Sequence, residues 1–394
     1  MALRPHQRIY ACFFLFAFAL GGMLSRMPDL QTKFGATESQ LGLMLIGMSV
    51  GSLISLTLSS PLIARLGART TALITILGTA LVYATVPWMP NMVWGFGALF
   101  IAGLLMGALE INLNIETDRR EALLGYRIMN RSHGFWSLGF FVTALLGASV
   151  RQAGISMEVH LAVTFAIVLV VGFWAMSGIA NAPARPALNT DKAPLIALPT
   201  LAILPFCVIG MAAFLVEGAG IDWSAIYMRD VFAVEPFIGG LGLTLFAFFM
   251  AMVRLFIDPV VDRFGPRDVA TALLVLSGIG VSVVGFAPHP YLAILGFVLM
   301  GAGCSAVYPL AVSAAAQRTD RPASVNVAAL GQVTFVVFFL APPLLGFVAE
   351  YFGIRNSYLV CLPVIVAGLW GARALSRRQE PEYVPAEAPV TPHG

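Results

Sequence analysis

Charged side chains are scarce in this sequence. Only 11% of its 394 residues are Asp, Glu, Lys or Arg, whereas 59% are hydrophobic. An ordinary globular domain carries about 25% charged residues. So few polar groups cannot cover a surface that faces water, which excludes a soluble protein with one large core. We expect lipid to cover the chain instead.

Lysine is almost absent as well, and paired cysteines and catalytic motifs are missing. The two lysines, Lys33 and Lys192, do not follow a glycine-rich loop, which excludes ATP hydrolysis by a P-loop. The four cysteines lie in separate apolar runs without a C-x-x-C pair, which favours simple packing over metal or disulfide roles. No H-E-x-x-H motif or Ser/His arrangement lies within those runs. We therefore expect no enzyme, no cofactor and no metal.

Long apolar runs are abundant. Twelve of them have about 18–25 residues, enough to cross a bilayer core, and they must be helical because lipid offers no hydrogen bonds. The runs lie at about 8–28, 39–63, 71–90, 93–116, 127–149, 157–180, 197–220, 236–257, 268–287, 290–313, 325–349 and 356–375. The sequence predicts an all-α membrane protein with twelve transmembrane helices. The first run shows no small-residue cleavage site and is predicted to be an uncleaved helix.

The positive residues indicate the orientation. If the N-terminus is cytoplasmic, only five of the 23 Lys and Arg residues fall on the outer side, namely Arg26, Lys33, Arg151, Arg229 and Arg355. Positive residues concentrate on the cytoplasmic side of membrane proteins, so both termini are expected inside. The basic residues are topology signals, and we expect no nucleic-acid partner.

The chain repeats itself at an offset of 198 residues. The matched pairs include Gly22 with Gly220, Gly42 with Gly240, Pro61 with Pro259 and Gly103 with Gly301. Two six-helix halves of the same direction follow, an arrangement known from parallel-repeat transporters. We expect an N-terminal six-helix bundle over 1–180, a cytoplasmic linker over 181–196, a C-terminal six-helix bundle over 197–376 and a disordered cytoplasmic tail over 377–394.

Two segments at equivalent positions of the repeat carry a resemblance. "SSPLIARLGART" (59–70) and "IDPVVDRFGPRD" (257–268) resemble the G-x-L-a-D-R-x-G-R-K loop of the major facilitator superfamily. The first copy has Ser60 and Ala64 where the motif has Gly and Asp, and the second has Asp258 at the Gly. The resemblance implies two bundles and a cytoplasmic gate loop, formed by Arg65, Gly67, Arg69, Asp258, Asp262, Arg263, Gly265 and Arg267. A solvated loop with ordinary positive-inside residues is the alternative.

Three further segments are similar to the MosC-like bacterial branch of this superfamily. They are "SRMPDLQTKFGATESQLGLML", "NRSHGFWSLG" and "VEGAGIDWSAIYMRDVF". The similarity implies a small-molecule substrate and a multi-pass location in the bacterial inner membrane, and we expect a monomer. It does not name a substrate.

Polar residues inside the fourth run are candidates for transport chemistry. Gly103, Gly107, Glu110 and Asn114 recur at helical spacing and form one stripe. Glu110 must face protein or water, because a carboxylate facing lipid costs several kcal/mol. It is either a carboxylate that binds protons or substrate, or one member of a static interhelical pair. Asn112 points elsewhere and is expected to bond to a neighbouring helix.

His133 in the fifth run is predicted to lie at the depth of Glu110. A carboxylate and an imidazole within reach would share a proton. Packing at the cytoplasmic end is the alternative for His133. Trp136, three residues later, would either stack on a substrate or pack against neighbours.

The seventh run contains a second buried carboxylate, Glu217. It is the other proton-coupling candidate, or it anchors a helix break at Gly218 and Gly220. The residues that follow would line the outer mouth or lie in the interface, where Trp and Tyr are favoured. These residues are Asp222, Trp223 and Tyr227.

The remaining substrate candidates are spread over three runs. Arg26 would pair with Asp29, Glu217 or Asp222, or its side chain would extend to water. Tyr308 aligns with Glu110 in the repeat. The amides of Asn326 and Gln332 suit hydroxyl-rich cargo, or join helices.

These features favour a secondary transporter working by alternating access. Our preferred interpretation is proton-coupled symport of a sugar-, inositol- or polyol-like solute. The alternative is proton-driven efflux of amphipathic compounds, whose family members usually show an Arg in the fourth helix and G-P-x-x-G-G in the fifth. Both features are missing here. A membrane sensor or assembly factor is the alternative of another class, although no signalling domain is visible.

Overall fold

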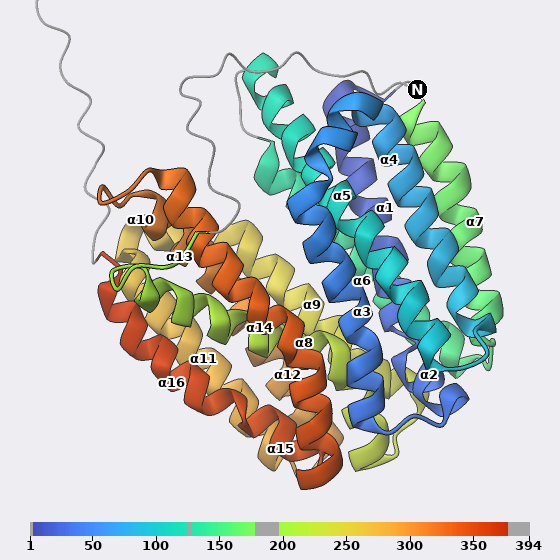
Figure 1. The fold of residues 1–394 in the computed structure, drawn as a ribbon. Helices are drawn as coiled ribbons and strands as arrows, with labels where there is room; N and C mark the ends of the chain where they lie inside the picture. The colour runs from blue at the N-terminus through green and yellow to red at the C-terminus, as the bar shows by residue number, and fades with distance from the viewer. Residues whose placement is uncertain (1–2, 125–127, 178–196, 377–394) are drawn as a thin grey trace, which may run out of the picture.

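The computed structural model describes residues 3–124, 128–177 and 197–376, and within them the chain forms helices and no strand (Figure 1). Twelve helical segments in these ranges are long and apolar enough to cross a membrane, which confirms the number predicted from the sequence. The predicted linker at 181–196 and the predicted tail at 377–394 lie outside the described residues.

The N-terminal half consists of α1 (Pro5–Leu24), α2 (Met27–Phe34), α3 (Glu38–Leu58), α4 (Ser60–Thr85), η1 (Val86–Trp88), α5 (Met92–Leu124), α6 (Met129–Gln152) and α7 (Met157–Met176). The C-terminal half consists of α8 (Leu204–Phe232), α9 (Pro236–Phe256), α10 (Asp258–Phe264), α11 (Pro266–Phe286), α12 (Pro290–Cys304), α13 (Val307–Ala316), α14 (Ala323–Phe352), α15 (Ile354–Leu359), α16 (Cys361–Gly371) and η2 (Ala372–Ala374). A helix of 21 residues, such as α3 or α9, is about 30 Å long and matches a bilayer core.

Local sequence explains where many helices begin. Proline occupies the first helical position of α9, α11 and α12, where its missing N–H is not needed. Thr37 caps α3 by accepting a hydrogen bond from the backbone N–H of Gln40, and the Gln40 side chain accepts one from the Thr37 N–H at 3.0 Å. These signals fix the ends of helices that lipid alone would leave undefined.

The helix that carries Glu217 differs from its predicted form. The run expected at 197–220 is instead α8, which begins at Leu204 and ends at Phe232. The predicted break at Gly218 and Gly220 is wrong, because α8 continues through both residues. Gly220 packs directly against the ring of Phe246 on α9, so this glycine serves close helix packing.

The repeat predicted from the sequence is also present in the packing. A Cβ on Gly103 of α5 would overlap the carbonyl oxygen of Met48, and a Cβ on Gly301 of α12 would overlap that of Phe246. Both the glycines and their partners are 198 residues apart. The motif glycines match as well, with φ 77° and ψ 164° at Gly67 and φ 85° and ψ 155° at Gly265. Each half therefore uses the same close approach and the same left-handed turn.

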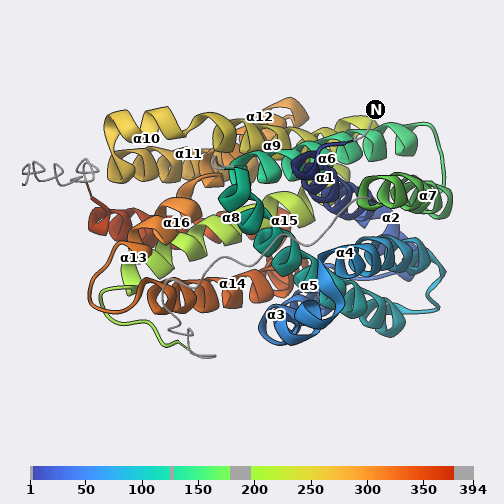
Figure 2. The same ribbon diagram turned by 90° about the horizontal axis from the view of Figure 1, so that it is seen from above.

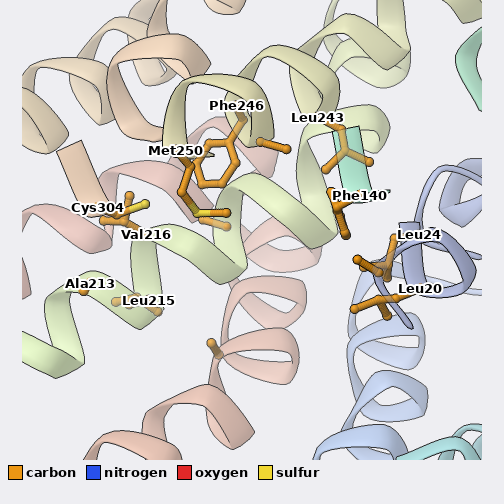
Figure 3. Packing of buried hydrophobic residues seen from close by; sticks show 14 of the residues in the cluster. Leu20, Leu24, Phe140, Ala213, Leu215, Val216, Leu243, Phe246, Met250 and Cys304 are labelled. Atoms are coloured by element: carbon orange, nitrogen blue, oxygen red, sulfur yellow. The ribbon is translucent and has the colours of Figure 1, made fainter. Parts of the chain in front are cut away.

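Two pairs of helices join the halves (Figures 1 and 2). Helix α3 packs on α14 where Gly42 meets Pro342, and α6 packs on α9 where Ala148 meets Gly240. The buried apolar side chains around this junction come from both halves, as Figure 3 shows for Phe140 of α6 and Leu243 of α9. Small residues allow the two bundles to approach closely at these points.

The two faces of the molecule differ. We call the end at which α1 begins the N-terminal face, and the opposite end the far face. Among the described residues, every hydrogen bond between the halves lies at the far face. One joins Arg229 Nη2 to Gln31 Oε1 at 2.6 Å, another the Ser39 N–H to Glu350 Oε2 at 3.1 Å. The helices of the two halves diverge toward the N-terminal face (Figure 1). The conformation is therefore closed at the far face.

Candidate substrate and proton site

Glu110 lies in the middle of α5, half-buried, and it has no hydrogen-bond or ion-pair partner among the residues that the structure describes. One turn earlier on the same stripe, Gly107 packs against Ser52 and Ser55 of α3. The hydroxyl of Tyr308, on α13 of the other half, is within electrostatic range of Glu110. A titratable group of the C-terminal half therefore lies within electrostatic range of the Glu110 carboxylate.

Asn112 has the structural role that the sequence predicts. Its side-chain Nδ2 donates to the carbonyl oxygen of Ala68 on α4 at 3.0 Å, and it is buried. This bond ties α5 to α4 and leaves the Glu110 stripe free to face elsewhere.

His133 does not form the predicted pair with Glu110. No hydrogen bond or ion pair joins the two within the described ranges, and α5 and α6 touch at few points. The exposed imidazole packs on Phe13, with ring centroids 5.0 Å apart, and lies within electrostatic range of Arg254 on α9. The prediction placed His133 beside Glu110 because the two residues lie at a similar depth in the membrane. It failed because the His133 side of α6 faces the C-terminal half.

Arg254 is the functional candidate that sequence reasoning missed. Its Nη2 lies 3.3 Å from Oε2 of Glu217, and its Nε donates to the carbonyl oxygen of Ser305 at 2.8 Å. The side chains remain partly accessible, at 31% for Arg254 and 14% for Glu217. In the sequence, Arg254 looks like an ordinary positive residue near the end of a span. It is, however, the only charged residue between Pro236 and Ile257, and this isolation could have marked it as a functional candidate.

The Ser305 carbonyl has no backbone N–H donor within its own helix, because of a proline. The run predicted as one helix at 290–313 is two, α12 and α13, separated at Ser305 and Ala306. Pro309 has no N–H to donate to the carbonyl four residues earlier, which is that of Ser305. A carbonyl without a partner inside a membrane is costly, and the Arg254 guanidinium satisfies it. The break and the cation therefore belong to one arrangement.

Trp223 and Tyr227 do not line an outer mouth, contrary to the prediction. Both are fully buried, and the Tyr227 hydroxyl donates to the carbonyl oxygen of Val284 at 2.5 Å. The far face is closed in this conformation, so the two rings form part of its packing. Asp222 is half-buried and within electrostatic range of Glu217.

Arg26 belongs to a buried network at the far face. Its Nη1 lies 2.9 Å from Asp29, which also accepts from Arg151, and its Nε donates to Nδ1 of His160 at 3.0 Å. The side chain is 3% exposed, so extension to water is wrong, and the partner is Asp29 rather than Glu217 or Asp222. Burial lowers the pKa of the Arg26 guanidinium, and the bond to Asp29 opposes this shift.

The other predicted substrate residues have mixed surroundings. Trp136 stacks on Phe140 with centroids 5.6 Å apart, and Tyr308 packs on Phe214 at 4.6 Å. Two amides are engaged at the N-terminal face: Asn326 Nδ2 donates to Asp320 at 3.3 Å, and Gln332 Oε1 accepts from the Ala197 N–H at 2.9 Å. Asn114 is half-buried, without a hydrogen-bond partner in the described part of the chain.

The predicted gate loops lie at the N-terminal face. Arg65, Arg69, Asp258, Asp262 and Arg263 are exposed. None of the ion pairs in the described residues joins the two loops. Separate loops agree with a conformation that is closed only at the far face, and a gate role for them remains a prediction.

The geometry assembles one constellation across the two halves. Glu110 is within electrostatic range of Tyr308 in the other half, and His133 is within electrostatic range of Arg254, which pairs with Glu217. No group of three or more His, Cys, Asp or Glu suited to a metal ion occurs within the described ranges.

Comparison with known proteins supports this architecture. Residues 206–392 match the family model of the Major Facilitator Superfamily. The chain is 28% identical to the uncharacterized transporter y4wD of Sinorhizobium fredii, over 91% of this chain and 94% of that one. It is 24% identical to the membrane protein MosC of Rhizobium meliloti, over 90% and 86% of the two chains.

Two solved structures share the fold. The nucleoside transporter NupG superposes with a TM-score of 0.69 at 13% identity, covering 94% of this chain and 98% of that one. A D-xylose-proton symporter gives 0.71 at 12% identity, covering 94% and 97%. Sequence, helix count and fold agree. The chain is a multi-pass membrane protein that is similar to transporters of the major facilitator superfamily over most of its length.

Proposed function

We propose that the chain is a proton-coupled symporter of a sugar-, inositol- or polyol-like solute. In this proposal it lies in the bacterial inner membrane with its N-terminal face and both termini in the cytoplasm. One chain supplies both sides of the site, so a monomer suffices. The observation that carries the proposal is Glu110, a carboxylate without a partner among the described residues, in the middle of a span and within electrostatic range of Tyr308.

A carboxylate in this position suits a proton carrier. A charged Glu110 that is enclosed in the membrane interior is costly, whereas the protonated side chain is neutral. Binding of the proton before the halves rock, and release afterwards, couples proton flow to the conformational change. Glu217 differs from Glu110, because Arg254 neutralises its charge. In this proposal, Glu217 binds a proton when that arginine is displaced.

The surroundings suit a hydroxyl-rich ring. Asn114 and Tyr308 offer hydrogen-bonding groups, and Trp136 offers a ring face for stacking. The two solved relatives named above, a nucleoside transporter and a D-xylose-proton symporter, handle solutes of this kind. These observations support the substrate class and leave its member to experiment.

The test is uptake by proteoliposomes under an imposed pH gradient, with a panel of sugars, inositols, polyols and amphipathic drugs. We expect acid-driven accumulation of one hydroxyl-rich solute, lost in both Glu110→Gln and Glu217→Gln while the proteins stay monodisperse. Asp268→Asn, an exposed carboxylate at the start of α11, is the matched control and should transport normally. Normal uptake by Glu110→Gln at every pH would remove Glu110 as the carrier, and drug export alone would favour efflux.

A further inference from the structure

A groove opens on the outside of the N-terminal half, near the N-terminal face. Its floor is α1 and its walls are α6 and α7, which both pack on α1 but barely touch each other (Figure 2). The cavity has a volume of about 610 Å³, within the range of ligand sites. Aromatic and aliphatic side chains form its surface, among them Phe14, Phe135, Leu138, Val171 and Trp174.

The groove is separate from the site between the halves. Arg131, Phe135 and Leu138 are four and three residues apart, so they share one face of α6. His133 is two residues from Arg131, about 200° around the helix, and points to the opposite side. The exposed walls, with Leu138 at 46% and Trp174 at 54%, face the surroundings of the bundle. A ligand here would enter from the bilayer.

The end of the groove at the N-terminal face is basic. Arg131 and His6 line it, and both Arg4 and Arg131 are within electrostatic range of the His6 imidazole. Arg131 has no ion pair or hydrogen bond to any described residue. Arg8 lies nearby on α1, where it donates to the carbonyl oxygens of Trp174 and Ala175.

No carboxylate on the surrounding helices balances this charge. Helices α1 and α6 contain no Asp or Glu, and the one acidic residue of α7, Glu158, is at the far face and pairs with Lys33. Glu121, at the end of α5, accepts instead from the backbone N–H groups of Ile128 and Met129. The groove thus combines an apolar body with an anion-attracting end.

We propose that this groove binds one anionic phospholipid of the bilayer. The phosphate group lies at Arg131 and Arg4, and an acyl chain lies along Phe14, Leu138 and Trp174. Basic pockets between transmembrane helices recognise anionic headgroups in this way. The apolar length of the groove and its opening toward the bilayer select a lipid over a soluble anion.

The test measures which lipids stay bound. Wild-type protein is reconstituted with equal amounts of phosphatidylglycerol and phosphatidylcholine, extracted into detergent, and examined by native mass spectrometry. We expect phosphatidylglycerol to be retained in excess, and Arg131→Gln to lower that excess about fivefold, the factor that about 1 kcal/mol per basic residue represents. Arg65→Gln removes another exposed arginine of the same face and should leave the excess unchanged.

A second variant separates the groove from surface charge. Ala11 lines the cavity, and Ala11→Phe fills it while every arginine stays in place. We expect this variant, checked for a monodisperse elution profile, to lose the bound phosphatidylglycerol too. Equal retention of both lipids by the wild type would overturn the proposal. So would equal losses in Arg131→Gln and Arg65→Gln, or full retention in Ala11→Phe.

Discussion

Arg254 of α9 holds Glu217 of α8 at 3.3 Å and, with the same guanidinium, the free carbonyl of Ser305. One cation thus connects three helices of the C-terminal half beside the site between the bundles. It neutralises a carboxylate inside a span and satisfies a backbone group that Pro309 leaves without a donor. Any event that protonates Glu217 or displaces Arg254 changes both contacts together.

The first prediction concerns this ion pair. Arg254→Gln leaves Glu217 without its cation, and Glu217→Gln leaves Arg254 without its anion, so each should lower thermal stability. The double variant removes both charges. Its loss of unfolding free energy should be smaller than the sum of the two single losses by about 1–3 kcal/mol. Thermal unfolding of the four proteins in detergent measures this coupling. Additive losses would show that the contact contributes nothing.

The second prediction concerns the helix break. Pro309→Ala restores an N–H that can donate to Ser305 and compete with Arg254, so α12 and α13 should join. Proline inside a helix costs about 3 kcal/mol in a simple host, so we expect a higher Tm together with slower transport. Pro290→Ala, at the first position of α12, is the control and should change neither. Unchanged transport by Pro309→Ala would mean that the break has no part in the cycle.

The third prediction tests close packing inside one bundle. A Cβ at Gly103 would overlap the backbone of α3, so Gly103→Ala should destabilise the protein by about 1–3 kcal/mol. Gly97 is on the same helix and a Cβ there would meet nothing within 4 Å. Gly97→Ala should be neutral or slightly stabilising, because alanine favours helix. Equal Tm values for the two variants would contradict the structure of the α3–α5 contact.

The fourth prediction concerns closure of the far face. Arg229 donates to Gln31 Oε1 at 2.6 Å and to the Pro28 carbonyl at 2.9 Å, so it ties α8 to α2 of the other half. Arg229→Gln should raise the population that is open at this face. Spin labels at Ala153 and Ala233, measured by double electron–electron resonance, report that population as longer distances. Arg318→Gln, which breaks an exposed pair within the C-terminal half, should leave the distribution as in the wild type.

The sequence predicts the large features because they depend on patterns along the chain. Apolar length sets the twelve spans, and the 198-residue offset already contains the equivalence of Gly103 and Gly301. Contacts between helices depend on rotation, which one sequence does not define. The predicted pairing of Glu110 with His133 was wrong for that reason, and the pairing of Arg254 with Glu217 was not predicted. Pro309 was a usable signal, because a proline in a span must free the carbonyl four residues earlier.

The most direct measurement follows both faces of the wild type at once. One label pair is Ala153 with Ala233 at the far face, and the other is Leu62 with Val260, repeat-equivalent exposed residues at the N-terminal face. Rocking of two rigid halves predicts reciprocal changes, so that conditions which lengthen the far-face distance shorten the other. Distances that stay fixed during active transport, or that lengthen together, would contradict alternating access by these bundles.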